Sequence, residues 1–170
     1  ATFDSIASIT VEWNPQQFVL AGDSVYLLAN GQYDANWNCD YPVQSINVAE
    51  LTARTITHAS RAVAYEGTLY LCNSVTDWAT YETTNTFFTY DVEADTLSNA
   101  SFLQGDTEEV ASNSVYMMEV NPKNGEIYIG LSGNKFVSSG MVHRYGHNGE
   151  LIHRFDAEGA NPNQVAFVQQ

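Results

Sequence analysis

Two segments combine aromatic side chains with acidic and amide side chains, the residue types that bind flat or ring-shaped ligands. Residues 31–42 read GQYDANWNCDYP, and residues 74–85 read SVTDWATYETTN. Rigid aromatic rings stack on a sugar, a corrin or a partner protein, and neighbouring polar groups add directed hydrogen bonds. The alternative is that these rings pack back onto neighbouring loops. The candidate ligand-binding residues are Tyr33, Trp37, Asp40, Trp78, Tyr81 and Phe136, the last from the shorter, more basic segment 132–140.

Histidines and serines offer little for catalysis. His143 and His147 have i, i+4 spacing, but we expect them on a strand and its hairpin turn, where this spacing gives no shared face for zinc. His58 and His153 are interpreted as ordinary surface residues. No serine occupies a GxSxG motif. We therefore expect no catalytic residue, no metal site and no enzyme activity.

Acidic residues supply the alternative of a calcium site. Carboxylate oxygens are the ligands that Ca²⁺ prefers, but no fixed ligand loop such as an EF-hand is present. Solvation is the simpler interpretation, so we expect no cofactor, with Ca²⁺ as the alternative. The acids considered for it are Asp106, Glu108, Glu109, Asp34, Asp40 and Asp77.

Composition indicates a folded chain that avoids nucleic acid. The 170 residues are 44% hydrophobic, which suffices for a core, and the formal net charge of −14 would repel a polyanion. No apolar run approaches the roughly 18 residues of a membrane span. Cys39 and Cys72 fit no metal motif; they would form a disulfide between neighbouring repeats if their Cα atoms approach within about 6 Å, and are otherwise two separate thiols.

One short phrase recurs three times along the chain. It reads SVYLLA at 24–29, TLYLCN at 68–73 and EIYIGL at 126–131, each time after an apolar strand and a turn. The tyrosines Tyr26, Tyr70 and Tyr128 lie about 44 and about 58 residues apart, a spacing typical of propeller blades with loop insertions. Turn residues such as Asn124 with Gly125 suit tight hairpins. The fold class is therefore all-β, a partial β-propeller of about three four-stranded antiparallel blades.

We expect one domain with incomplete ends. Residues 14–57, 58–104 and 105–158 form the blades, residues 1–13 an outer strand of a preceding blade, and residues 159–170 an inner strand of a further blade. Helical periodicity is not convincing anywhere. Because a propeller needs roughly four to eight blades, either the chain is the C-terminal part of a longer propeller, which we favour, or copies self-associate to complete the ring.

The blade topology places the candidate residues on one face. In a four-stranded blade, the loop between strands two and three emerges on the same side as the connection to the next blade. Both aromatic segments are such loops, and each is longer than a hairpin needs. Trp13 is a further candidate, from a flanking connection.

The repeats resemble a known family. A proline after a short apolar strand end, as in ITVEWNP and RFDAEGANP, followed by an inner strand and a strand with a central tyrosine, resembles the YncE-like surface-layer propellers. The stretch from SVYMMEVNPKNGEIYIGLSG through MVHRYGHNGELIHRFDAEGANPNQVAFV is similar to the end of the DUF5074 group of Bacteroidetes cell-surface propellers. The resemblance implies an exported, often lipid-anchored protein at the cell surface or in the periplasm, typically seven-bladed. It transfers no ligand residue.

Three functions follow as hypotheses. Some of the resembling proteins capture a ligand for an outer-membrane receptor, and one related group binds cobalamin, so the first hypothesis is non-catalytic binding of a small molecule, a glycan or a receptor protein. It predicts that Trp37 and Trp78 are accessible and point into one cleft. The second is a structural or protein-interaction propeller. The third is a propeller enzyme of the lactonase or lyase type, which predicts converging acids and histidines near the central axis.

Overall fold

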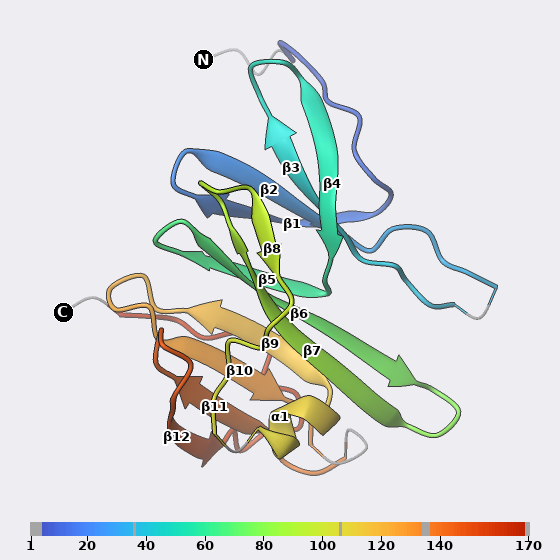
Figure 1. Cartoon of the computed structure of the whole chain (residues 1–170). Helices are drawn as coiled ribbons and strands as arrows, with labels where there is room; N and C mark the ends of the chain where they lie inside the picture. The colour runs from blue at the N-terminus through green and yellow to red at the C-terminus, as the bar shows by residue number, and fades with distance from the viewer. Residues whose placement is uncertain (1–4, 36, 106, 134–136, 169–170) are drawn as a thin grey trace.

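The computed structural model describes residues 5–35, 37–105, 107–133 and 137–168. Within these ranges the chain forms three four-stranded antiparallel sheets, each with its strands in chain order. Figure 1 shows the sheets side by side in the order of the sequence, from blue and cyan through green to orange and red. The prediction of an all-β fold built from repeated four-stranded sheets is confirmed.

The first sheet starts with a tight hairpin and contains the first copy of the repeated phrase. Val19 of its first strand pairs with Tyr26 of its second, and both side chains are buried. Alternation of side chains across a strand leaves Phe18 and Leu20 exposed on the other face. The strands are β1 (Pro15–Ala21), β2 (Ser24–Ala29), β3 (Pro42–Asn47) and β4 (Thr52–His58).

The second sheet contains a long hairpin that the sequence did not predict. Its strands are β5 (Arg61–Tyr65), β6 (Thr68–Asp77), β7 (Glu82–Asp91) and β8 (Thr96–Ser98). The loop expected at residues 74–85 is mostly strand, because β-branched residues pair across it, for example Val75 with Thr84. We call residues 73–86 the ribbon. The outer strand β8 is only three residues long.

The third sheet follows a short helix. Its strands are β9 (Val115–Val120), β10 (Ile127–Leu131), β11 (Met141–Tyr145) and β12 (Leu151–Asp156). The helix α1 (Glu108–Ser112) corrects the expectation of no helix: five residues are too few to give a periodic pattern, although Val110 anchors it in the core. Among the described residues, no helix has the length and apolar character to cross a membrane.

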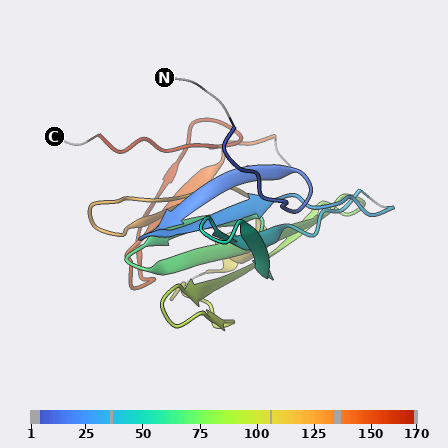
Figure 2. The same cartoon turned by 90° about the horizontal axis from the view of Figure 1, so that it is seen from above.

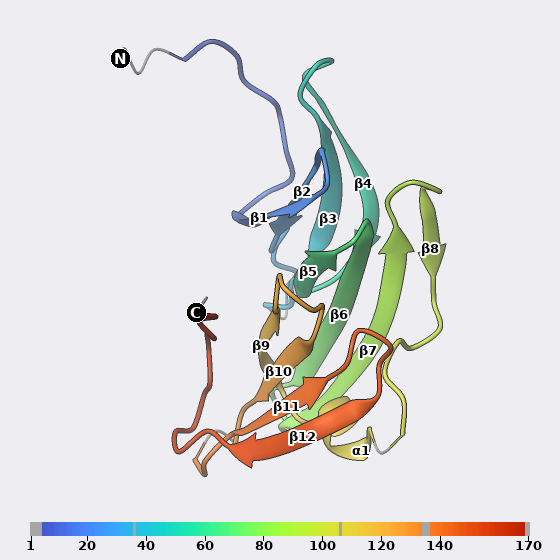
Figure 3. The same cartoon turned by 90° about the vertical axis from the view of Figure 1, so that its left-hand side faces the viewer.

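Two apolar clusters join the sheets, and the second sheet contributes to both. Leu69 and Leu71 of β6 pack toward the first sheet, whereas Tyr70 and Cys72 pack toward the third. This division follows from the two-residue period of a strand. The inner strands β1, β5 and β9 are neighbours, with β5 in contact with both others. Figure 2 shows the sheets from above, and Figure 3 labels β1, β5 and β9 one above another along the side that we call the inner side of the molecule.

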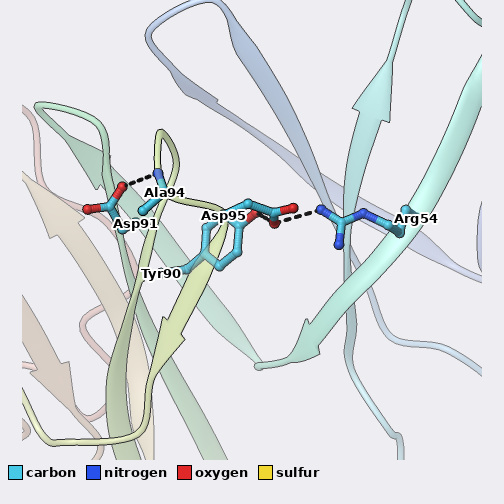
Figure 4. Close-up of polar contacts among 5 residues, drawn as sticks. All are labelled: Arg54, Tyr90, Asp91, Ala94 and Asp95. Atoms are coloured by element: carbon cyan, nitrogen blue, oxygen red, sulfur yellow. Dashed lines mark hydrogen bonds and ion pairs between the residues drawn. The ribbon is translucent and has the colours of Figure 1, made fainter.

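Outer strands are linked by a charged pair, shown in Figure 4. Arg54 of β4 donates to the carboxylate of Asp95, in the turn before β8, with Nη2 2.7 Å from Oδ1. The buried Tyr90 hydroxyl also donates to this carboxylate, and its ring packs edge-on against Tyr26 at 5.9 Å between ring centroids. The Tyr90 hydrogen bond, followed by the Arg54 bond, lowers the pKa of Asp95. The first and second sheets are therefore linked at their outer edges.

The chain ends differ from the expected edge strands. No strand is assigned within residues 5–12 or 161–168, which run beside the sheets in Figure 3. The C-terminal segment covers the third sheet instead: Phe167 packs edge-on against Tyr128 at 5.3 Å between ring centroids. The sheets occupy residues 15–58, 61–98 and 115–156. Counting them as blades at 14–57, 58–104 and 105–158, with partial blades at both ends, stays a prediction.

The cysteines do not form the disulfide considered from the sequence. Both are free: Cys39 is partly buried in the loop between β2 and β3, and Cys72 is fully buried in β6. Burial raises the pKa of the Cys72 thiol to about 12. Cys72 is therefore a small apolar core residue, in which burial outweighs the opposing effect of the Arg61 charge on the thiol pKa.

Candidate functional site

A cleft of about 680 Å³ opens on the inner side of the molecule, where segments of all three sheets meet. The loop between β2 and β3 supplies Trp37 and Tyr41, and the ribbon supplies Val75 and Trp78. The remaining wall comes from the connections that precede the inner strands β5 and β9, together with Asn161 of the C-terminal segment. This is the face on which the topology places the loops between second and third strands.

Trp37 is presented by a loop that relies on side-chain hydrogen bonds. The carboxylate of Asp34 accepts the Asn38 backbone N–H at 2.8 Å and the Asn38 side-chain amide at 3.1 Å. A single bridge pairs Tyr33 with Cys39 across the loop. Trp37 itself has a positive φ of 65° and a 78% exposed side chain. The loop therefore holds this ring out into solvent at the mouth of the cleft.

Trp78 is presented by a regular strand pair. The ribbon keeps its register from Asn73 with Thr86 to Asp77 with Glu82. At its tip the Tyr81 N–H donates to the Asp77 carbonyl oxygen at 2.7 Å. Trp78 begins this turn and is 61% exposed. Trp37 and Trp78 are thus both exposed beside the cleft, but an irregular loop supports the first and a regular strand pair supports the second.

The base of the cleft is tied together by hydroxyl groups. Ser60 Oγ donates to the Cys72 carbonyl oxygen at 3.2 Å and accepts the Ser74 N–H at 3.0 Å. Ser74 Oγ accepts the Val115 N–H at 3.4 Å, which links the second sheet to the third. These bonds fix the connection before β5, the ribbon and the start of β9 relative to one another.

Arg61, the first residue of β5, lies in the cleft wall and bridges two sheets. Its Nη1 donates to the Ser60 carbonyl oxygen at 2.7 Å, and its Nε to the Tyr116 carbonyl oxygen of β9 at 3.3 Å. Nearby, burial raises the pKa of the Tyr41 hydroxyl, and the positive charge of Arg61 acts in the opposite direction. An arginine thus brings positive charge to a cleft of an otherwise acidic protein.

A smaller cavity of about 280 Å³ adjoins the cleft along the inner strands. The two share Tyr41, Ser60, Arg61 and Tyr116 in their walls. The smaller cavity also contains Glu119 of β9, whose pKa is raised by burial. Arg61 therefore lies where the two spaces meet.

The structure brings together some of the predicted site residues. Trp37 and Trp78 are exposed and line one cleft, the arrangement that the binding hypothesis requires. Tyr33 does not line the cleft but lies beside Trp37, with 5.9 Å between the two ring centroids. Trp13 and Tyr81 are exposed but do not line the cleft, and Phe136 lies outside the described residues.

Asp40 points away from the cleft lining. A Cβ at Gly31 would lie 1.7 Å from Asp40 Oδ1, so this carboxylate sits over Gly31. The His58 ring donates from Nδ1 to the Asp40 carbonyl oxygen at 2.7 Å. Asp40 therefore shapes the loop and its contact with β4.

The sequence did not identify Arg61, Tyr41 and Tyr116 as site residues. A usable signal existed for Arg61, because it begins an inner strand, next to the loop face. The signal was weak, since a single arginine at a strand start is common. Only the convergence of three sheets distinguishes it.

Acids and histidines do not converge in the described part of the chain, which has no group of three or more His, Cys, Asp or Glu side chains suited to a metal ion. Asp34 and Asp77 cap their own turns. His143 is buried in β11, with Nε2 3.1 Å from Glu109 Oε2, and Glu109 also lies 3.5 Å from Arg154 Nη1. The calcium alternative stays a prediction: its described acids belong to no such group, and Asp106 lies outside the described residues.

Comparison with known proteins identifies the fold and no more. The chain is similar to the β-propeller domain of the Trilobed protease from Pyrococcus furiosus, whose structure reveals an open velcro topology. The TM-score is 0.53 at 11% identity, and the match covers 86% of this chain and 44% of that one. The fold is that of a β-propeller. The three sheets are thus propeller blades, and the chain spans less than half of the propeller structure that it matches.

No family model and no curated protein match this sequence.

Proposed function

We propose that this protein is a non-catalytic binding propeller that holds a small molecule or a glycan in the inner cleft. The observation that carries the proposal is the pair of exposed indoles, Trp37 and Trp78, on the wall of one cleft. Large rings exposed to water on two separate loops cost solvation free energy, and a ligand ring that stacks on them recovers it. Ser74, Thr76 and Ser114 add hydroxyl groups to the same wall, which suit the hydrogen bonds of a sugar.

The family resemblance extends this proposal to the cell envelope. We propose that the protein is exported, lipid-anchored at the cell surface or in the periplasm, and captures its ligand for an outer-membrane receptor. Support comes from the sequence resemblance to YncE-like and DUF5074 propellers and from the propeller fold. Fractionation of the native host, with detection in the membrane and after surface proteolysis, tests the location independently of the ligand.

Tryptophan substitutions test the cleft directly. A glycan array and calorimetry with sugars, cobamides and divalent cations identify a ligand; Trp37→Ala and Trp78→Ala should each weaken its binding about tenfold or more, the usual cost of truncating a central aromatic contact. Trp13→Ala is the matched control, because Trp13 is equally exposed but does not line the cleft. Equal binding by all three variants would refute the proposed site.

A protein partner is the second candidate function. Tyr33, Tyr81 and Val75 are exposed around the cleft, and aromatic residues of this kind are enriched at protein interfaces. Pull-down of envelope proteins by the wild type separates the two candidates. A partner that is lost from Tyr81→Ala but kept by Trp37→Ala would favour the flat surface over the cleft.

A further inference from the structure

We propose that Arg61 binds the carboxylate of an acidic sugar in the inner cleft, so that the preferred ligand is a glycan containing a uronic acid. This inference rests on the proposed binding function and names the ligand class of the same site. It starts from the charge of Arg61. The other three arginines each lie within ion-pair distance of a carboxylate: Arg54 of Asp95, Arg144 of Glu126 and Arg154 of Glu109.

Within the described ranges, the hydrogen-bond partners of Arg61 are carbonyl oxygens only. Its bonds to Ser60 and Tyr116 use one N–H on Nη1 and the one on Nε. A guanidinium has five N–H donors, so one on Nη1 and both on Nη2 remain available at a residue that lines both cavities. The two carbonyl bonds also fix the orientation of the guanidinium plane. A positioned fork of this kind matches a carboxylate with two parallel hydrogen bonds.

The number of cations favours a singly charged anion. Within the described part of the chain, Arg61 is the one cationic residue in the wall of either cavity. The protein carries a formal charge of −14, so a polyanion or a doubly charged phosphate meets a repulsive field that one arginine cannot offset. A single carboxylate is neutralised by one guanidinium. The smaller cavity contains Glu119, which further disfavours dense negative charge.

Aromatic and hydroxyl groups around Arg61 favour a sugar as the carrier of that carboxylate. Trp37 and Trp78 provide ring faces, and Ser74 Oγ accepts the Val115 N–H while its own proton finds no partner among the described residues. Stacking, neutral hydrogen bonds and one charged fork together match a sugar ring with hydroxyls and one acid group. A plain fatty or amino acid would leave one of these features unused.

The test compares two disaccharides that differ at a single C6, which carries a carboxylate in one and a hydroxymethyl group in the other. Cellobiouronic acid and cellobiose are titrated into the 170-residue chain by calorimetry and tryptophan fluorescence. The wild type should bind the acid at least about tenfold more tightly, because hydrogen bonds to a charged group are the strong ones. The difference should shrink as sodium chloride is raised.

Arginine variants locate the effect. Arg61→Gln should remove the preference for the acid and keep residual binding of both sugars, and Arg61→Lys, which keeps the charge without the fork, should restore only part of it. Arg54→Gln is the matched control and should behave like the wild type, since Arg54 lies at the outer edge. Circular dichroism and thermal unfolding confirm that each variant is folded.

The possible outcomes separate this inference from the proposed function. Equal binding of both sugars by the wild type, with loss in Trp78→Ala, would refute the acidic ligand and leave the sugar site standing. A preference for the acid that survives in Arg61→Gln would refute the role of Arg61. If glucose 6-phosphate binds more tightly than glucose by the same factor, the site recognises anions in general, and the proposed ligand class is refuted. Binding of neither charged nor neutral sugar would refute the glycan site itself.

Discussion

The inner and outer ends of the blade junctions use arginine in opposite ways. At the outer end, Arg54 and Tyr90 both donate to Asp95, so the positive charge is consumed within the protein. At the inner end, Arg61 also bridges two sheets, but it donates to the carbonyl oxygens of Ser60 and Tyr116. A carbonyl orients a guanidinium without neutralising it.

This difference separates the structural role of Arg54 from the binding role that we propose for Arg61. The pair between Arg54 and Asp95 is exposed and holds two sheets together at their edges. Arg61 holds two sheets together as well and keeps its net charge beside an open cleft. The same residue type therefore links sheets at both ends, and at the inner end its charge stays available for the recognition that we propose.

The largest expected effect on stability comes from the apolar cluster between the second and third sheets. Ile129→Ala removes a fully buried side chain of the cluster between the second and third sheets, which should lower the free energy of unfolding by about 2–5 kcal/mol. Urea denaturation measures it. Ile152→Ala is the matched control, because Ile152 is 45% exposed on β12. Similar decreases in the free energy of unfolding of both variants would show that burial in this cluster does not account for the stability of the junction between the second and third sheets.

A smaller effect is expected at the polar anchor of the ribbon. The buried Asn85 amide donates to the carbonyl oxygens of Val110 and Asn113, at 2.7 and 2.6 Å, and so ties the ribbon to the segment of α1. Asn85→Ala leaves these acceptors without a donor and should cost about 1–3 kcal/mol.

Hydrogen exchange separates this local anchor from global stability. Amides of the ribbon should exchange faster in Asn85→Ala, whereas those of the first sheet keep their protection relative to the global unfolding limit. Asn99→Ala, at an exposed position, is the control. Uniform acceleration throughout the chain would contradict a local role for Asn85.

A carboxylate introduced next to Arg61 should pair with its guanidinium, as Asp95 pairs with Arg54, and so compete with an acidic ligand. Tyr116→Glu places a carboxylate on the residue whose carbonyl Arg61 contacts, so the acidic disaccharide should bind about tenfold more weakly while cellobiose changes less. Calorimetry with both sugars measures this. Tyr81→Glu adds the same charge outside the cleft lining. An equal loss in both variants would indicate general repulsion by added charge.

The smallest effect is expected at the outer pair, and it should depend on pH. Because the folded-state pKa of Asp95 lies below its ordinary value of 3.8, the ionised carboxylate stabilises the fold above that pH, and this contribution is lost as the pH falls through the folded pKa. Asp95→Asn should therefore be slightly less stable than the wild type at pH 6.

Thermal unfolding from pH 6 down to pH 2 measures this difference. The difference in stability between wild type and Asp95→Asn should close toward pH 2. Salt should also reduce it, because the side chains of Arg54 and Asp95 are both exposed. A gap that stays constant down to pH 2 would show that the carboxylate charge is not responsible.

Strand positions were predictable where the local pattern is strong. The alternating phrases around Tyr26, Tyr70 and Tyr128 fix β2, β6 and β10 because a strand buries every second side chain. Trp37 and Trp78 were found because exposed aromatics on long connections are unusual. The ribbon was missed, since threonines beside a tryptophan and acids are equally typical of loops. Helix α1 was missed because five residues carry no periodicity.

The sequence by itself determined the repeated sheet, its alternation and the presence of aromatic rings on one face. These properties depend on residues close together in the chain. Tertiary structure alone decided that Arg61 faces a cleft while Arg54 meets Asp95, 41 positions away, and that Trp37 and Trp78 share one wall. Such outcomes depend on how three sheets pack against one another. The local sequence distinguishes the two arginines only weakly, through the position of Arg61 at the start of an inner strand, because a group from another sheet pairs with each guanidinium.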